Sequence, residues 1–132
     1  MKCLPLIAFA AMSIIAQSIP DWANAATVTL VPFEPANVGL VSLSDKCNTP
    51  ARVDEAYADA PAIASLQGVT GIAEVKIALT ASGALSGETL FASSGNPWLD
   101  RAAMESAGTA RFTPAVANCR RVGGMYLYEV DF

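Results

Sequence analysis

The 132-residue sequence contains no histidine, and its three cysteines include no CxxC pair. Without histidine, neither a Cys–His nucleophile pair nor a histidine-bearing zinc site can form. No serine lies in the G-x-S-x-G pattern that marks a nucleophile elbow. These absences argue against an enzyme, and we expect no catalytic residue, no metal and no cofactor.

Basic residues are also few. Eight Lys and Arg residues stand against twelve Asp and Glu residues, which gives a net charge of −4. No basic cluster is present, so nucleic acid and anionic membrane surfaces are not expected partners. The length suffices for one small domain, and the chain has neither an internal repeat nor a low-complexity linker.

The N-terminal residues have the pattern of a secretory signal. Lys2 gives a basic start, an apolar run extends from Cys3 to Ile15, and Ala23-Asn24-Ala25 has small residues where a signal peptidase cuts. We therefore predict that residues 1–25 are a signal peptide cleaved near Ala25, and that the protein is periplasmic or secreted. The alternative is an uncleaved helix anchored in the inner membrane, although the apolar run is shorter than the roughly 20 residues that span a bilayer.

Cleavage would leave two cysteines, Cys47 and Cys119. An even number of cysteines in an exported chain predicts a disulfide, and only one pairing exists. A catalytic or metal-binding thiol is the alternative, and the missing histidine and CxxC motif count against it.

Three segments have the pattern of antiparallel strands. Residues 73–79 alternate aliphatic and more polar side chains, and a hairpin loop at 80–83 leads to a second strand at 85–93. Residues 125–132 form the third, with aromatic and aliphatic residues on one face. An additional short strand is expected at 26–33, ending at Pro32, whereas residues 34–46 fit either a strand or a loop.

Two helices are expected between these strands. The Ala-rich residues 52–66 are moderately helical, with a start or restart at Pro61. Asn96 is a suitable N-cap for a second helix that begins at Pro97. Its inner face is built almost entirely of small residues, so the helix can lie close to a sheet, with Leu99 and Trp98 supplying bulk at one end. That face consists of Leu99, Ala102, Ala103, Ser106, Ala107 and Ala110.

The sequence therefore predicts an α+β fold, a three-stranded antiparallel sheet with two helices packed on one face, plus a short N-terminal strand extension. We divide the chain into the signal peptide at 1–25, an N-terminal extension with an extra strand at 26–46, and one domain at 47–132.

Short motifs follow one another through the last part of the chain. They are Gly71-Ile-Ala-Glu-Val-Lys-Ile, Ser82-Gly83, Ser93-Ser94-Gly95-Asn96, Leu99-Asp100-Arg101-Ala102-Ala103, Arg111-Phe112-Thr113-Pro114-Ala115 and the closing strand Tyr126 to Phe132. In this order and spacing, residues 57–132 resemble the C-terminal domain of TonB-family energy transducers. The run from Asn118 to Leu127 is similar to exported variants of that domain that carry a disulfide.

The resemblance implies a function in protein binding. In that family the domain pairs a short peptide of outer-membrane transporters with the exposed edge of its last strand. A protein or peptide partner in the cell envelope, such as an outer-membrane transporter, is therefore expected to bind by β-strand addition. The matching edge consists of Met125, Tyr126, Leu127, Tyr128, Glu129, Val130, Asp131 and Phe132, and the nearby contact turn of Ser93, Ser94, Gly95 and Asn96.

Some features of a full transducer are missing. Ala58 follows Tyr57 where the family has proline, and the chain has neither the family's His-bearing membrane-helix motif nor its long Pro-rich segment. These departures count against a role in energy transduction.

Two interpretations of the last strand remain open. Its edge binds a partner peptide, or it is already covered by the strand at 27–31 or by a second copy in a homodimer. In the second case the protein is a stand-alone structural or self-associating module. Glu129 and Asp131 fit both, because they would either discourage aggregation or select a basic peptide.

Overall fold

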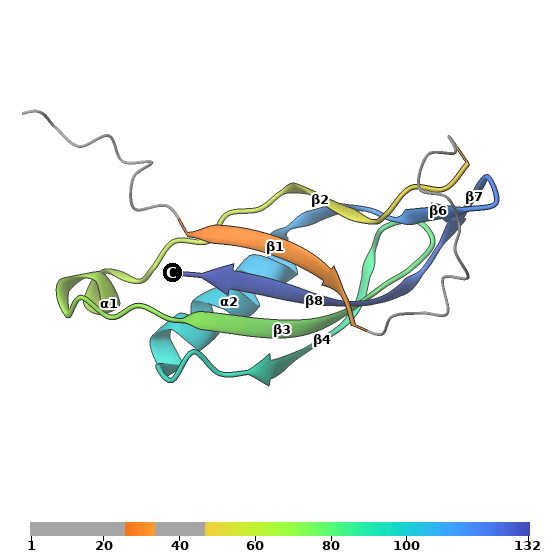
Figure 1. Ribbon diagram of the computed structural model, residues 1–132. Helices are drawn as coiled ribbons and strands as arrows, with labels where there is room; N and C mark the ends of the chain where they lie inside the picture. The colour runs from red at the N-terminus through yellow and green to blue at the C-terminus, as the bar shows by residue number, and fades with distance from the viewer. Residues whose placement is uncertain (1–25, 34–46) are drawn as a thin grey trace, which may run out of the picture.

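The computed structural model describes residues 26–33 and 47–132. Its main layer is a four-stranded antiparallel sheet with the strand order β1-β8-β3-β4 (Figure 1). These strands are β1 (Thr27–Pro32), β3 (Ile72–Leu79), β4 (Leu85–Ala92) and β8 (Gly124–Asp131). The predicted signal peptide at 1–25 and the ambiguous segment at 34–46 lie outside the described residues.

The two central strands, β3 and β8, carry most of the core. They pair in a regular antiparallel register from Ile72 opposite Asp131 to Leu79 opposite Gly124. Alternate side chains of both strands point to one face and are buried there, as the alternating sequence predicted. These side chains are Ala73, Val75, Ile77 and Leu79 of β3 and Tyr126, Tyr128 and Val130 of β8.

Helix α2 (Pro97–Thr109) covers this buried face, crossing behind the sheet in Figure 1. The Asn96 side chain accepts hydrogen bonds from the backbone N–H groups of Trp98 (2.9 Å) and Leu99 (3.3 Å), so the predicted N-cap is confirmed. The helix packs mainly on β3 and β4. Its buried residues are Leu99, Ala103, Ser106 and Ala107, and the small size of the last three permits the close approach.

One buried polar contact joins α2 to the sheet. The hydroxyls of Ser106 and Tyr128 lie 2.6 Å apart, and the Tyr128 ring meets Phe112 edge-on with centroids 5.9 Å apart. Burial raises the pKa of Tyr128, while the hydrogen bond to Ser106 acts in the opposite direction. The partnered hydroxyls explain how a polar pair is tolerated in this core.

The hairpin between β3 and β4 depends on Gly83. Its φ of +86° lies in the region that side chains disfavour, and a Cβ there would come within 2.6 Å of the Phe112 carbonyl oxygen. The hairpin therefore packs directly against β5.

Shorter elements complete the fold. Helix α1 (Ala62–Leu66) follows Pro61, as predicted, but the expected helix at 52–60 is wrong. Arg52–Glu55 instead forms strand β2, because Val53 faces Phe112 of β5 between outward-facing charged residues. The remaining strands are β5 (Arg111–Thr113), β6 (Ala115–Ala117) and β7 (Arg120–Val122).

The predicted α+β class, with antiparallel strands and two helices, is confirmed. The three-stranded sheet is wrong, because β1 joins the sheet as a fourth strand beside β8. Within the described part of the chain, no helix is long and apolar enough to cross a membrane.

Candidate strand-binding site along β8

Strand β8 is not the edge of the sheet, which corrects the prediction of an edge strand at Met125 to Phe132. It lies between β3 and β1, and β1 pairs with it from Thr27 opposite Asp131 to Pro32 opposite Tyr126. Of the alternatives that the sequence left open, the structure contains the one in which the N-terminal strand covers this edge.

The backbone of β8 divides into two rows. The Phe33 N–H donates to the Met125 carbonyl (3.0 Å), while the Phe132 N–H donates to the Gly71 carbonyl on the β3 side (3.0 Å). Because successive residues of a strand direct their backbone groups to opposite sides, the odd-numbered residues of β8 face β1 and the even-numbered residues face β3. We call the odd-numbered set, Met125, Leu127, Glu129 and Asp131, the β8 outer row.

Strand β1 is attached with little burial. Only Val28 and Leu30 of this strand are half-buried, and its other residues are exposed. They lie opposite Val130 and Tyr128 of β8 and rest at the border of the core. Each central strand, by contrast, has several fully buried side chains. The interaction of β1 with the sheet therefore depends more on backbone hydrogen bonds than on the hydrophobic effect.

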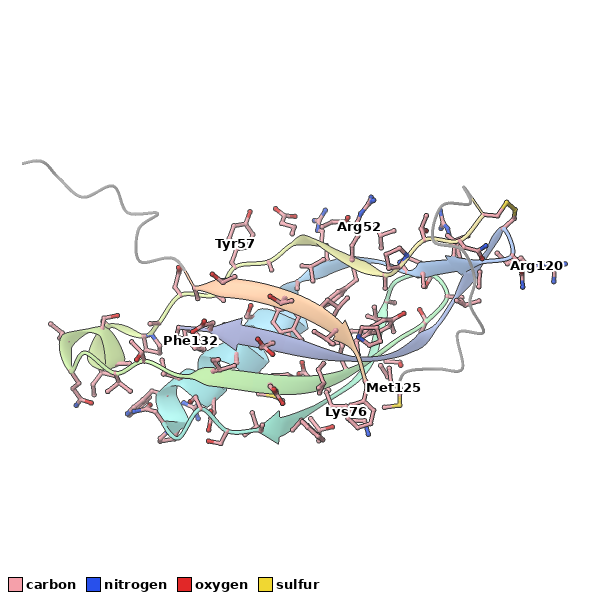
Figure 2. The ribbon with its side chains drawn as sticks, viewed as in Figure 1. Arg52, Tyr57, Lys76, Arg120, Met125 and Phe132 are labelled. Atoms are coloured by element: carbon pink, nitrogen blue, oxygen red, sulfur yellow. A yellow bond between two sulfur atoms is a disulfide. The ribbon has the colours of Figure 1, made fainter. Side chains whose placement is uncertain are left out.

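A second contact holds the end of β1 on the solvent face of the sheet. The Phe33 ring meets Phe91 of β4 edge-on, with centroids 5.3 Å apart, and Lys76 Nζ lies 4.1 Å from the Phe33 centroid. Figure 2 shows Lys76 and Met125 close to the end of β1. Such contacts are worth about 0.5–1.5 kcal/mol for an aromatic pair and about 0.5–1 kcal/mol for an exposed cation–π pair. We call Phe33, Lys76 and Phe91 the aromatic latch.

Pro32 removes one backbone N–H donor from the side of β1 that faces away from β8. It stands opposite Tyr126, an even-numbered residue whose backbone groups face β3, so the missing N–H of Pro32 costs no hydrogen bond to β8. The side that lacks a donor is the outer side of β1. A proline in this position discourages further strand pairing.

Carboxylates gather on the solvent face of β8. Glu129 lies between Thr29 of β1 and Glu74 of β3, and Asp131 lies between Thr27 and Ile72. Like charges directly opposite one another destabilise a sheet. A basic residue in the place of Thr29 would face Glu129 and offset this repulsion.

The Ser93–Asn96 turn is engaged in its own structure. Asp100 of α2 accepts hydrogen bonds from the Ser93 hydroxyl (2.5 Å), the Ser94 hydroxyl (2.7 Å) and the Ser94 N–H (2.7 Å). Burial alone would raise the pKa of Asp100, but these three donors hold it below its usual value. The turn follows β4, so β3 separates it from the β8 outer row. Its role as a partner contact stays a prediction.

The disulfide between Cys47 and Cys119 is present in the structure, as predicted. It joins the start of the domain to the turn between β6 and β7, where the Cys119 N–H also donates to the Cys47 carbonyl (2.9 Å). Figure 2 places Arg120 in this hairpin, at the opposite end of the molecule from Phe132. The disulfide is therefore remote from the C-terminal end of β8.

Other polar groups are used in local pairs. Asp54 of β2 accepts hydrogen bonds from Thr113 of β5 and from Arg52, and these lower its pKa. Arg111 lies 3.5 Å from Glu55 and pairs locally, while Phe112 is buried. Among residues 26–33 and 47–132, no group of three or more His, Cys, Asp or Glu side chains is arranged to hold a metal ion.

Sequence reasoning missed the aromatic latch and misplaced Trp98. The latch joins β1, β3 and β4, and no local sequence pattern predicts a contact between residues so far apart in the chain. Trp98 was expected to add bulk under α2, but 44% of it is exposed, and it lines a shallow surface depression with Pro97 and Arg101.

Comparison with known families agrees with this geometry. The family model for the C-terminal domain of the Gram-negative bacterial TonB protein matches residues 59–132, more than half of the chain. The chain therefore belongs to the TonB C-terminal family, a class of protein-interaction domains associated with the cell envelope. No curated protein and no solved structure gave a match.

Proposed function

We propose that this protein binds an extended segment of a partner protein in the periplasm, by strand addition along the β8 outer row. The proposal rests on the position of β1 in the chain. Its six residues lie outside the family match at 59–132, yet they pair with β8 along its length. The last strand of the family domain thus accepts a strand from outside that domain.

The β8 outer row would supply the affinity and its flanking side chains the selectivity. A partner strand that replaces β1 would direct two aliphatic side chains toward Val130 and Tyr128, as Val28 and Leu30 do. On the other face its side chains would meet Glu129 and Asp131. We therefore infer a partner segment that alternates aliphatic with basic or hydroxylated residues.

Domains of this family interact with cell-envelope proteins such as outer-membrane transporters. We propose the periplasmic segment of such a transporter as the partner. This location follows from the expected signal peptide.

A second candidate is a self-contained or self-associating module. The same pairing of β1 with β8 supports it, since the edge is already occupied. In that case no peptide would bind, or a second copy would supply its own β1.

The test is an NMR titration of the isotope-labelled protein. The probes are synthetic peptides from the periplasmic N-terminal segments of outer-membrane transporters encoded in the same genome. Binding at the proposed site would perturb the amides of Leu127 and Glu129. Glu129→Gln should weaken binding of basic peptides, while Glu105→Gln on the exposed side of α2 should not.

Two other results would contradict strand addition at β8 or favour the second candidate. Perturbations confined to β4, or none with any peptide, would refute strand addition at β8. A concentration-dependent dimer in analytical ultracentrifugation that dissociates when β1 is mutated would favour the second candidate.

A further inference from the structure

We propose that β1 is an exchangeable resident strand, which closes the β8 outer row when no partner is present and is displaced when one binds. The inference rests on the proposed function in one respect, namely that the β8 outer row binds a partner strand. The behaviour of β1 itself can be measured without any partner.

The partner and β1 would need the same backbone groups. Thr27, Thr29 and Val31 stand opposite Asp131, Glu129 and Leu127, whose N–H and C=O groups face β1. One row cannot pair with two strands, so the two occupants exclude each other. The apparent affinity for a partner is then the intrinsic affinity reduced by the fraction of molecules in which β1 has left.

Extension of the sheet by a partner strand beyond β1 is disfavoured. The outer side of β1 is short of one donor at Pro32, and the strand is only six residues long. Replacement of β1 is therefore favoured over addition to it.

Release of β1 would leave the core largely in place. None of its residues is fully buried, and most of the buried side chains come from β3, β8 and α2. A strand attached in this way is expected to open locally, at a free energy below that of global unfolding.

The aromatic latch sets how readily β1 leaves. Phe33 directly follows Pro32, and its ring reaches across the solvent face to Lys76 and Phe91. These contacts exist only while β1 is paired with β8. Weakening them should raise the open fraction without disturbing the buried face.

A released β1 stays close to its site. Residues 34–46 connect Phe33 to Cys47, and the disulfide to Cys119 fixes that end to the β6–β7 hairpin. Because β1 and its site belong to the same chain, re-pairing of a displaced β1 is intramolecular and does not depend on protein concentration. Weak partners would therefore be rejected, and β1 would return after a partner dissociates.

Amide hydrogen exchange, read residue by residue by NMR, tests the proposal on the purified protein. The amides of Leu127 and Glu129 depend on β1, whereas those of Tyr128 and Val130 depend on β3. We expect the first pair to exchange at least about tenfold faster than the second.

Variants of the aromatic latch test whether its contacts hold β1 on β8. Phe33→Ala should accelerate exchange at Leu127 and Glu129 by about tenfold and leave Tyr128 and Val130 unchanged. Lys76→Gln should act in the same direction but less strongly. Ile72→Ala, an exposed apolar residue at the other end of the same face, is the matched control and should change neither pair. Equal exchange of the two pairs in wild type and in Phe33→Ala would overturn the proposal, because β1 would then leave only on global unfolding.

Failure of this inference is distinguishable from failure of the proposed function. Selective opening with no binding of the transporter peptides, even to Phe33→Ala, would refute the function and leave the exchangeable strand standing. Peptide binding at β8 with the same affinity for wild type and Phe33→Ala, together with uniform exchange, would refute the exchangeable strand alone.

Discussion

The sheet has two outer strands, β1 and β4, and they are attached in different ways. Strand β4 has eight residues, follows β3 through a tight hairpin, and contributes to the surface on which α2 packs. Strand β1 has six residues and comes from a distant part of the chain. A set of backbone hydrogen bonds and the aromatic latch hold it in place.

The difference follows from where each strand lies relative to the core. Strand β4 lies within the region matched by the family model, while β1 lies before it. Loss of β4 would uncover α2 and the β3 side chains, whereas loss of β1 would uncover mainly one row of backbone groups. The molecule thus has one permanent outer strand and one that we propose to be replaceable.

The largest effect is expected from the disulfide, whose closed loop contains β4 but neither β1 nor β8. Its cysteines are 72 positions apart, so the chain-entropy model assigns it about 4 kcal/mol. The double variant Cys47→Ser/Cys119→Ser should lose up to about this much free energy of unfolding in urea. In exchange experiments the amides of Tyr128 and Val130 should then lose protection. A loss below about 1 kcal/mol would show that the loop is constrained by other means.

A smaller effect is expected at the hairpin that attaches β4. Gly83→Ala places a Cβ against the Phe112 carbonyl and forces an unfavourable φ, so we expect a loss of about 2 kcal/mol or more. Gly87→Ala in β4 is the matched control, because nothing lies within 4 Å of its Cβ position. Urea unfolding of the two variants should differ clearly, and equal stabilities would contradict the close packing of the hairpin against β5.

The smallest effect concerns pH. The pKa of Asp100 is lowered in the folded protein, so its stabilisation is present above the unfolded carboxyl pKa of about 3.9 and is lost as the pH falls below it. Thermal melts from pH 7 to pH 2 should show a larger loss in wild type than in Asp100→Asn. A variant that loses stability as steeply as wild type would assign the acid sensitivity to other groups.

Much of the family domain could be predicted from the sequence. The alternation in residues 73–79, the Asn96-Pro97 helix start and the small inner face of α2 are local patterns, and each is reproduced in the structure. The paired cysteines were also predicted correctly.

The errors lie where tertiary pairing decides the outcome. Arg52–Glu55 has too few residues to show a strand period beside the Ala-rich segment, and only its pairing with β5 makes it a strand. The strand that pairs with β8 could not be predicted for the same reason. A strand pattern at 27–31 shows that the segment can pair, but it carries no information about which edge it joins. The aromatic latch likewise arises only when three distant segments meet.

The central claim, that β1 and a partner strand compete for the β8 outer row, is tested most directly by locking β1 in place. Val31 and Leu127 are paired in register on the solvent face, at a spacing that suits a disulfide. The double variant Val31→Cys/Leu127→Cys would be titrated with the tightest-binding transporter peptide before and after reduction. The single variant Val31→Cys, taken through the same redox treatment, controls for changes at Cys47–Cys119. We predict that the cross-linked protein loses peptide binding by at least about tenfold and regains it on reduction. Equal binding by the cross-linked and reduced forms would contradict the account.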